Sequence, residues 1–208
     1  ELYDEKVDFL GKVKNGKTGF SVIIPGKDDR VILSYKGVNN LLTWQDVHSS
    51  LLETKWLYIS TMLGKSLETI EEIFAWSKRH NVKIALNISE YLAGKGLRVL
   101  KPMLENADIF ILNKDEASIL TGKKLINEII SLLSINPEGI IVITDGYNPI
   151  IAAYKNKIYK KAVKKVKPVD TTGAGDAFAA GFVYGIITNK TIPKALDFAC
   201  KEALSVLM

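Results

Sequence analysis

The chain has 208 residues, which suits one domain, or one large domain with a small appendage. A content of 47% hydrophobic and 25% charged residues excludes a disordered chain. No apolar run approaches the roughly 18 residues of a membrane helix, so we expect no membrane association. The single cysteine, Cys200, excludes a disulfide framework and favours a reducing, cytoplasmic location. The net charge of +5 suits acidic small substrates as well as nucleic acid.

The first part of the chain predicts a β-hairpin and the rest alternates strands with helices. The hairpin strands are expected at 18–24 and 30–34, followed by a short helix from the cap Thr43 to about 52. Further strands are predicted at 55–60, 83–87, 109–112 and 140–144, with a second hairpin at 150–154 and 157–161. Helices are predicted at 66–80 (capped by Ser66), 97–105, 115–120, 125–133, 174–187 and 192–207.

This alternation predicts an α/β fold, with a parallel sheet covered by helices on both faces. Ligands of such sheets bind beyond the carboxyl ends of the strands. Functional residues are therefore expected just after Ser60, Asn87, Leu112 and Thr144.

A phosphate-loop pattern near the start of the chain is a decoy. Residues 11–18 match G-x-x-x-x-G-K-[ST], ending in Lys17 and Thr18. The pattern needs a helix directly after it, so that backbone N–H groups surround a phosphate. The following segment is rich in β-branched residues and ends at Pro25, which predicts a strand. A basic turn before a strand is the better interpretation, and we expect Lys17→Ala to leave ATP binding unchanged.

The feature that best indicates chemistry is the segment 170–178, Asp-Thr-Thr-Gly-Ala-Gly-Asp-Ala-Phe. Gly173, Ala174 and Gly175 lie where a helix is expected to begin, so their N–H groups can converge on an anion. Asp176 stands at the helix entrance, where a carboxylate can take the proton of an attacking hydroxyl. A glycine-rich turn with an aspartate cap is the purely structural alternative.

This segment resembles the signature of the ribokinase-type (PfkB) carbohydrate kinase family. Other motifs occur in the family's order. Residues 18–19 and 37–39 match the lid strands and the loop behind them, and residues 113–116 match the N-x-x-E motif. Residues 144–146 match the T-x-G motif, and residues 192–199 match a helix beside the adenine pocket. The resemblance covers the back two thirds or so of the family's domain. It implies one truncated, ribokinase-like domain over 1–208, a parallel-sheet sandwich with a small β lid at about 15–36. Since the chain starts at Glu1 and stops at Met208 inside a predicted helix, we expect both ends to be cut.

The resemblance also implies roles for individual residues. Asp176 would be the catalytic base, with Gly173, Ala174 and Gly175 as the anion hole. Asn113 and Glu116 would organise Mg²⁺ through water, because Mg²⁺ keeps several waters and few protein ligands. The implied nucleotide-binding residues are Thr144, Gly146 and, bordering the adenine pocket, Cys200. Asp170 and Thr172 match positions that hold a monovalent cation in several relatives, which implies K⁺ as a further cofactor here; an Asx-turn is the alternative for Asp170.

The acceptor side is represented by fewer residues. Gly37, Asn39 and Asn87 are predicted to line the acceptor pocket. The loop 61–64 lacks the carboxylate that ribose-binding relatives carry, which argues against ribose itself, and Pro149 replaces the second glycine of T-x-G-x-x-G. Relatives often dimerise through the lid, so a homodimer is expected there.

The sequence therefore predicts an ATP- and Mg²⁺-dependent kinase acting on a hydroxyl of a sugar or sugar acid. A nucleoside kinase of the same family and an inactive nucleotide-binding fragment are the alternatives. The seven lysines of residues 155–167 are interpreted as a solvated face, and only Tyr159 offers the aromatic interleaving that nucleic-acid binding favours. The expected partner is a small molecule and not a nucleic acid.

Overall fold

The computed structural model describes residues 15–26, 30–47, 53–166 and 171–208. Contacts divide the chain into two compact units, one formed by Glu1–Lys55 with Met62–Val82 and the other by Trp56–Thr61 with Lys83–Met208. The single-domain organisation expected from the sequence stays a prediction. Among the described residues, no helix combines the length and apolar character that crossing a membrane requires.

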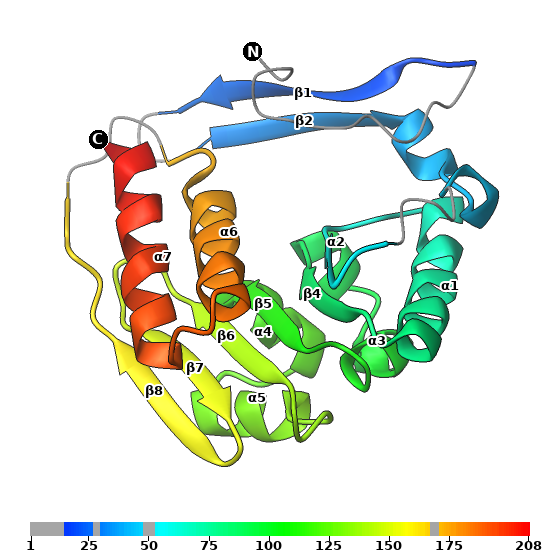
Figure 1. Ribbon diagram of the computed structural model, residues 1–208. Coiled ribbons are helices and arrows are strands. Elements are labelled where there is room, and N and C mark those ends of the chain that lie inside the picture. The colour runs from blue at the N-terminus through cyan, green and yellow to red at the C-terminus, as the bar shows by residue number, and fades with distance from the viewer. Residues whose placement is uncertain (1–14, 27–29, 48–52, 167–170) are drawn as a thin grey trace. The chain divides into compact units, whose positions relative to one another are not determined.

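The first unit contains a hairpin, two short 3-10 turns and a helix. Strands β1 (Thr18–Pro25) and β2 (Arg30–Gly37) pair antiparallel, as predicted (Figure 1). The turns η1 (Val38–Leu41) and η2 (Trp44–Asp46) lead toward helix α1 (Lys65–His80). Because Thr18 begins a strand and not a helix, the phosphate-loop pattern lacks the helix it would need.

Two predictions about the ends of helices in this unit need correction. The expected helix from Thr43 is a 3-10 turn over Trp44–Asp46, although Thr43 and Asp46 do form the predicted reciprocal cap; residues 48–52 lie outside the described residues. Ser66 does not cap α1, because Gly64 precedes the helix with a φ of 60°. The buried Ser66 hydroxyl instead donates to the Asn39 carbonyl at 2.7 Å and accepts from the Leu42 N–H at 2.9 Å.

The second unit is built on a six-stranded sheet in the order β3-β4-β5-β6-β7-β8. Strands β3 (Trp56–Ile59), β4 (Lys83–Asn87), β5 (Ile109–Asn113) and β6 (Ile140–Thr144) run parallel. Strands β7 (Ile150–Tyr154) and β8 (Lys157–Lys161) add the predicted hairpin antiparallel to β6. The inner strands β4, β5 and β6 have buried residues on both sides of the pleat, as expected for a covered sheet, whereas only Ile59 is buried on the edge strand β3.

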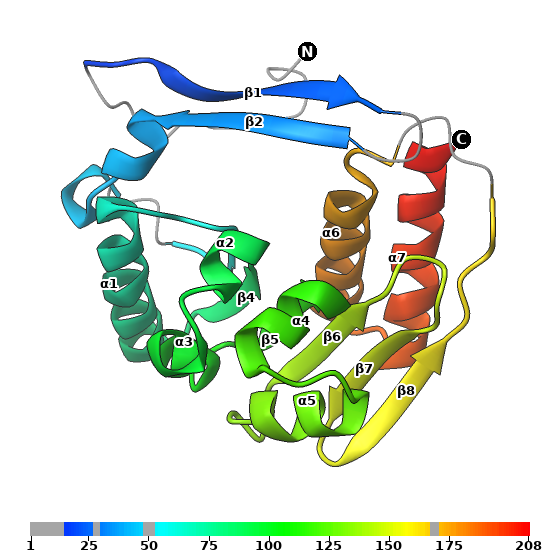
Figure 2. The same ribbon diagram turned by 180° about the vertical axis from the view of Figure 1, so that it is seen from behind.

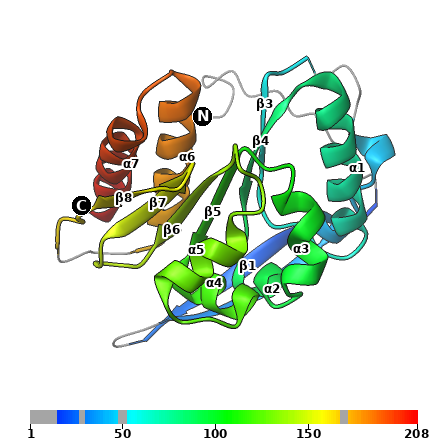
Figure 3. The ribbon, with the colours of Figure 1, turned by 90° about the horizontal axis from the view of Figure 1, so that it is seen from below.

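Helices cover both faces of this sheet (Figures 2 and 3). Four lie on one face: α2 (Glu90–Ala93), which the sequence did not predict, α3 (Leu97–Leu104), α4 (Lys114–Thr121) and α5 (Ile126–Leu133). On the opposite face, α6 (Ala174–Ile187) and α7 (Ile192–Leu207) lie side by side. The core beneath α6 and α7 includes Phe178 and Phe182, whose rings stack with centroids 6.3 Å apart.

Glycine allows α6 and α7 to approach each other closely. A Cβ built on Gly185 would lie 2.8 Å from the Cβ of Ala195 and 2.9 Å from its Cα, which is closer than such atoms approach in proteins. Gly175, ten residues earlier on the same helix, has no atom within 4 Å of an added Cβ. The two glycines therefore offer a matched pair for testing this packing.

We expect Gly185→Ala to lower the free energy of unfolding by about 1–3 kcal/mol, because the new methyl group overpacks against the α7 backbone. Gly175→Ala should raise it by up to about 1 kcal/mol, because alanine favours the helix and meets no neighbour. Urea unfolding of both variants and the wild type measures these changes. A stability loss of equal size at both positions would contradict the proposed packing.

Candidate functional site

The carboxyl ends of the parallel strands carry one polar residue each on the side of the sheet that faces α6. The residues, from β3 to β6, are Tyr58, Asn87, Asn113 and Thr144. Two positions earlier, each strand contributes a residue to the core around α6: Trp56, Ala85, Ile111 and Val142. Since side chains alternate along a strand, the four polar residues lie on the same side as that core.

The strand register places these residues in a staggered row. Asn113 pairs directly with Thr144, whereas Asn87 pairs with Ile111. Tyr58 pairs with Ala85, two residues before Asn87. Asn87 therefore lies two residues nearer to the strand starts than Asn113, and Tyr58 two residues nearer than Asn87. The row therefore slopes across the carboxyl edge, which is where ligands of parallel sheets bind.

Asn113 and Glu116 hold each other in place at the start of α4. The Asn113 Oδ1 accepts the Glu116 N–H at 2.8 Å, and the Glu116 Oε2 accepts the Asn113 N–H at 2.7 Å. This reciprocal capping box satisfies two backbone donors of the helix start. Burial raises the pKa of the Glu116 carboxyl, the Asn113 N–H lowers it, and the nearby charges of Glu90 and Asp115 raise it further. The pair thus supplies an amide and a carboxylate, which are oxygen ligands suited to Mg²⁺.

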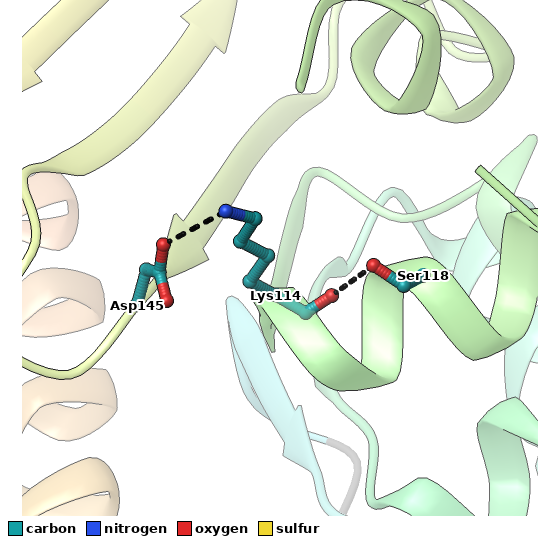
Figure 4. A network of polar contacts seen from close by, with 3 residues as sticks. All are labelled: Lys114, Ser118 and Asp145. Atoms are coloured by element: carbon teal, nitrogen blue, oxygen red, sulfur yellow. Dashed lines mark hydrogen bonds and ion pairs between the residues drawn. The ribbon is translucent and has the colours of Figure 1, made fainter. Parts of the chain in front are cut away.

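An ion pair joins the start of α4 to the turn after β6. The Lys114 Nζ lies 3.2 Å from the Asp145 Oδ2, and Figure 4 shows the two side chains pointing toward each other. The Lys114 carbonyl accepts the Ser118 hydroxyl at 2.8 Å within α4. The Asp145 carbonyl accepts the Asn148 N–H at 2.8 Å, which closes the turn containing Gly146. The two segments that carry N-x-x-E and T-x-G are therefore linked directly.

The N-terminus of α6 has the geometry of an anion-binding helix end. Gly173 precedes the helix with a φ of 83°, a left-handed conformation that glycine adopts without strain. Its carbonyl accepts the Ala177 N–H at 2.8 Å. Asp176 is exposed in the first turn, and Phe178, two residues later, is buried in the core. The first N–H groups of a helix and its dipole both favour a bound anion at this end.

A cavity of about 510 Å³ lies next to this helix end. Its walls come from the T-x-G turn, β8 and the segment after it, the first turn of α6 and the last turns of α7. Apolar side chains such as Ile150, Phe178 and Leu204 line much of it, and the Lys161–Asp197 ion pair lies among its lining residues. A largely apolar cavity with a few polar groups is typical of small-molecule sites.

The structure brings part of the predicted site together at this cavity. The predicted residues that line it are Thr144, Gly146, Ala174, Gly175 and Cys200. Burial raises the pKa of the Cys200 thiol. Gly173, Asp176, Asn87, Asn113 and Glu116 belong to the same compact unit but are not part of the lining. Their catalytic and binding roles stay predictions.

The remaining predicted residues are Gly37, Asn39, Asp170 and Thr172. Gly37 and Asn39 belong to the first unit, where the Asn39 Oδ1 accepts the Gly19 N–H at 3.1 Å and an added Cβ on Gly37 would lie 2.1 Å from the Lys17 carbonyl oxygen. Both therefore support the hairpin, and contact with an acceptor stays a prediction. Thr172 is exposed, while Asp170 lies outside the described residues, so the cation site also stays a prediction.

Tyr58 and the Lys114–Asp145 pair were missed by the sequence interpretation. The Tyr58 hydroxyl accepts a hydrogen bond from Asn87 at 3.0 Å. A polar residue near the carboxyl end of a strand was the available signal. The sequence interpretation used this signal for Asn87 in β4 but not for Tyr58 in β3. The ion pair carried no signal, because Lys114 and Asp145 are ordinary charged residues 31 positions apart.

Comparison with known proteins identifies relatives of this chain. The family model described as pfkB family carbohydrate kinase matches residues 2–207. Ribokinase of Bacillus subtilis is 27% identical over 201 residues, covering 95% of this chain and 65% of the relative. The 5-dehydro-2-deoxygluconokinase of Bacillus licheniformis is 26% identical over 168 residues, covering 76% of this chain and 52% of the relative. The chain thus spans about 65% of the length of the ribokinase that it matches.

Solved structures with the same fold include nucleoside and sugar kinases. Adenosine kinase of Anopheles gambiae superposes with a TM-score of 0.84 at 19% identity, covering 93% of this chain and 63% of the other. A probable sugar kinase of Rhizobium etli superposes with a TM-score of 0.82 at 22% identity, covering 91% of this chain and 60% of the other. These structural matches support the fold, and the family model spans nearly the entire sequence. The chain belongs to the pfkB family of carbohydrate kinases.

Proposed function

We propose that the protein transfers the γ-phosphoryl group of ATP to a hydroxyl group of a sugar or sugar acid. The observation that carries this proposal is the N-terminus of α6, which combines a left-handed glycine, first-turn amides and an exposed carboxylate beside a cavity. Phosphoryl transfer depends mainly on positioning and on stabilising negative charge, and this helix end can do both. Membership of the pfkB family supports the reaction class.

In this proposal, Asp176 acts as general base. Its carboxylate accepts the proton of the acceptor hydroxyl as that oxygen attacks the γ-phosphorus. The N–H groups of the Gly173–Ala174–Gly175 segment donate to the oxygens of the transferred phosphoryl group. The helix dipole, about half a positive charge at this end, opposes the negative charge that builds up there. The proton ends on Asp176, and the ADP oxygen leaves with the electron pair of the broken bond.

The nucleotide and cations would be held by neighbouring residues. The cavity would take the base and sugar of ATP, with Thr144 and Gly146 toward its phosphates and Cys200 at its wall. Asn113 and Glu116 would hold Mg²⁺ through water, since the capping box orients both side chains. Bound Mg²⁺ neutralises charge on the phosphate oxygens. Asp170 and Thr172 would hold a monovalent cation such as K⁺, which we propose as an additional cofactor.

The acceptor would contact Asn87, while contact with Gly37 and Asn39, which belong to the first unit, stays a prediction of the sequence. We also propose that the hairpin mediates a homodimer. Its paired residues place six exposed apolar side chains on one side: Phe20, Val22, Ile24, Val31, Leu33 and Tyr35. The other side carries fewer, with Ser21 and Ser34 hydrogen-bonded at 2.8 Å. Large contiguous apolar patches usually mark contact surfaces.

We expect Asp176→Asn to lower turnover by about 10²- to 10⁴-fold while nucleotide affinity stays nearly unchanged, because asparagine keeps the size of the side chain but accepts no proton. Steady-state assays with a panel of sugars, sugar acids and nucleosides, together with calorimetric titration of ATP, measure both effects on the full-length protein. Glu128→Gln is the control, because it neutralises a first-turn carboxylate on α5, which carries no site residue. Normal turnover of Asp176→Asn would refute the proposed function.

Glu116→Gln tests the proposed role of this residue with Mg²⁺. The amide keeps an acceptor for the Asn113 N–H but removes the negative charge, so the Mg²⁺ concentration needed for half-maximal activity should rise roughly 10-fold or more. Titration of Mg²⁺ at saturating ATP measures the change. An unchanged Mg²⁺ requirement would contradict the assignment.

The same variant has an expected effect on the pH dependence of stability. Because burial raises the pKa of Glu116 in the folded state, its stabilising contribution is complete below its unfolded pKa and is lost as pH rises through the folded value. The free energy of unfolding of Glu116→Gln should therefore rise relative to that of the wild type as the pH increases above the unfolded pKa of Glu116. Denaturant titrations at several pH values check this, and a relative loss over the same range would show that the sign is wrong.

Leu33→Glu tests the proposed dimer. A buried charge in the interface should shift the molar mass measured by light scattering from that of a dimer to that of a monomer. Ile32→Glu is the matched control, since Ile32 is 49% exposed and Leu33 56%, and neighbouring residues of a strand face opposite sides. A monomeric wild type, or equal effects of both variants, would refute dimerisation through this side.

A further inference from the structure

Tyr58 is an exposed aromatic residue on the strand at one edge of the sheet. Its side chain lies on the side of the sheet that faces α6, because Trp56, two residues earlier on β3, packs against the core around that helix. Tyr58 itself is 45% exposed, so packing does not account for the choice of a tyrosine at this position. It lies at the same edge as Asn87, which follows from the pairing of β3 with β4.

Asn87 orients the Tyr58 hydroxyl. The Asn87 Nδ2 donates to the Tyr58 Oη at 3.0 Å. A phenol has one proton, and when its oxygen accepts from Asn87 that proton is directed to a different acceptor. The Asn87 Oδ1, on the other end of the same amide, is an acceptor. The pair therefore presents one donor and one acceptor next to each other at the carboxyl edge.

Asp176 lies close enough to act electrostatically on Tyr58. Burial is the main cause that raises the pKa of the Tyr58 hydroxyl, the Asn87 hydrogen bond lowers it, and the negative charge of Asp176 raises it again. The hydroxyl therefore stays protonated at neutral pH and acts as a donor. Tyr58 and Asp176 also belong to the same compact unit.

We propose that Tyr58 binds the acceptor substrate and helps to determine its specificity. Its hydroxyl donates to one oxygen of the acceptor, while the Asn87 Oδ1 accepts the proton of a neighbouring hydroxyl. The ring lies against a C–H face of the same molecule. A pair of adjacent hydroxyls on an apolar carbon frame is the chemistry of a sugar or polyol, so the inference specifies the acceptor class of the proposed function, on which it rests.

The test removes only the phenolic oxygen. In the full-length protein, Tyr58→Phe should lower kcat/KM for the acceptor roughly 10-fold, because one hydrogen bond to the substrate is lost. The KM for ATP and the melting temperature should stay as in the wild type. Tyr154→Phe is the matched control, because Tyr154 lies at the opposite end of the sheet from Tyr58. Tyr154 follows Ala153, and Ala153 pairs with Ile141 near the start of β6.

Deoxy acceptors identify the hydrogen bond itself. For the analogue that lacks the hydroxyl bound by Tyr58, the wild type and Tyr58→Phe should have equal kcat/KM, whereas other deoxy analogues should keep the roughly 10-fold difference. A Tyr58→Phe variant with the acceptor kinetics of the wild type would overturn the proposal. So would a variant whose KM for ATP and melting temperature change together with the acceptor kinetics, because that pattern indicates a structural role.

The proposed function can fail separately. If the wild type phosphorylates no acceptor of the panel, the kinase assignment fails and the role of Tyr58 fails with it. If the wild type is active and Asp176→Asn is not, but Tyr58→Phe equals the wild type, only the inference about Tyr58 is refuted. The same assay, run on these three proteins, distinguishes the two results.

Discussion

The packing of α6 against the sheet and α7 is the constraint on which the site depends. Phe182 has no exposed surface, and Gly185 approaches the α7 backbone at Ala195 so closely that no side chain fits between them. These contacts fix the axis of α6. The N-terminus of a helix held in this way cannot move independently, so Gly173 and Asp176 are placed relative to the strand ends by the core. An anion site needs such placement, because its N–H groups act only when they already point at the ligand.

Short hydrogen-bonded links connect the segments that surround this helix end. Asn87 bonds to Tyr58 between β4 and β3, Asn113 and Glu116 cap each other, and Lys114 pairs with Asp145 across to the turn after β6. The first and third of these links join neighbouring strands or the segments that follow them, and the second fixes the start of α4. Surface ion pairs and single hydrogen bonds are individually worth only about 1 kcal/mol. Their value here is positional, since together they limit how the loops at the carboxyl edge can move.

The fold alone does not select the acceptor. Proteins with this fold include both an adenosine kinase and a probable sugar kinase, and the sequence identity of each to this chain is below 25%. Specificity therefore depends on individual side chains at the strand ends. Tyr58 and Asn87 are the pair proposed for this selection, whereas the helix end at α6 is proposed for the phosphoryl transfer itself. In this proposal, Asp176 on α6 and the Tyr58–Asn87 pair on β3 and β4 belong to different elements of the same unit.

Much of the fold could be predicted, because local sequence patterns indicate most of its strands and helices. Short, largely apolar runs predicted the parallel strands, and the hairpin over Ile150–Tyr154 and Lys157–Lys161 has the predicted bounds. The helix end at Ala174 was equally visible, since small residues followed by an apolar run indicate a helix start. Ser66 shows the limit: a serine before a helical pattern predicts a cap, yet its hydroxyl bonds to Asn39 and Leu42, which are distant in the sequence.

By itself, the sequence predicted the chemistry of the site, because a glycine-rich segment at the start of a helix, followed by an aspartate, can bind an anion and accept a proton. Only the tertiary structure decided which residues share that site. The pairing of β3 with β4 brings Tyr58 to Asn87, and the packing of α7 against α6 and β8 brings Cys200 and Lys161 to the cavity beside the helix end. Such neighbours are separated by tens of residues along the chain. Strand register and helix packing, which no local pattern encodes, are what bring them together.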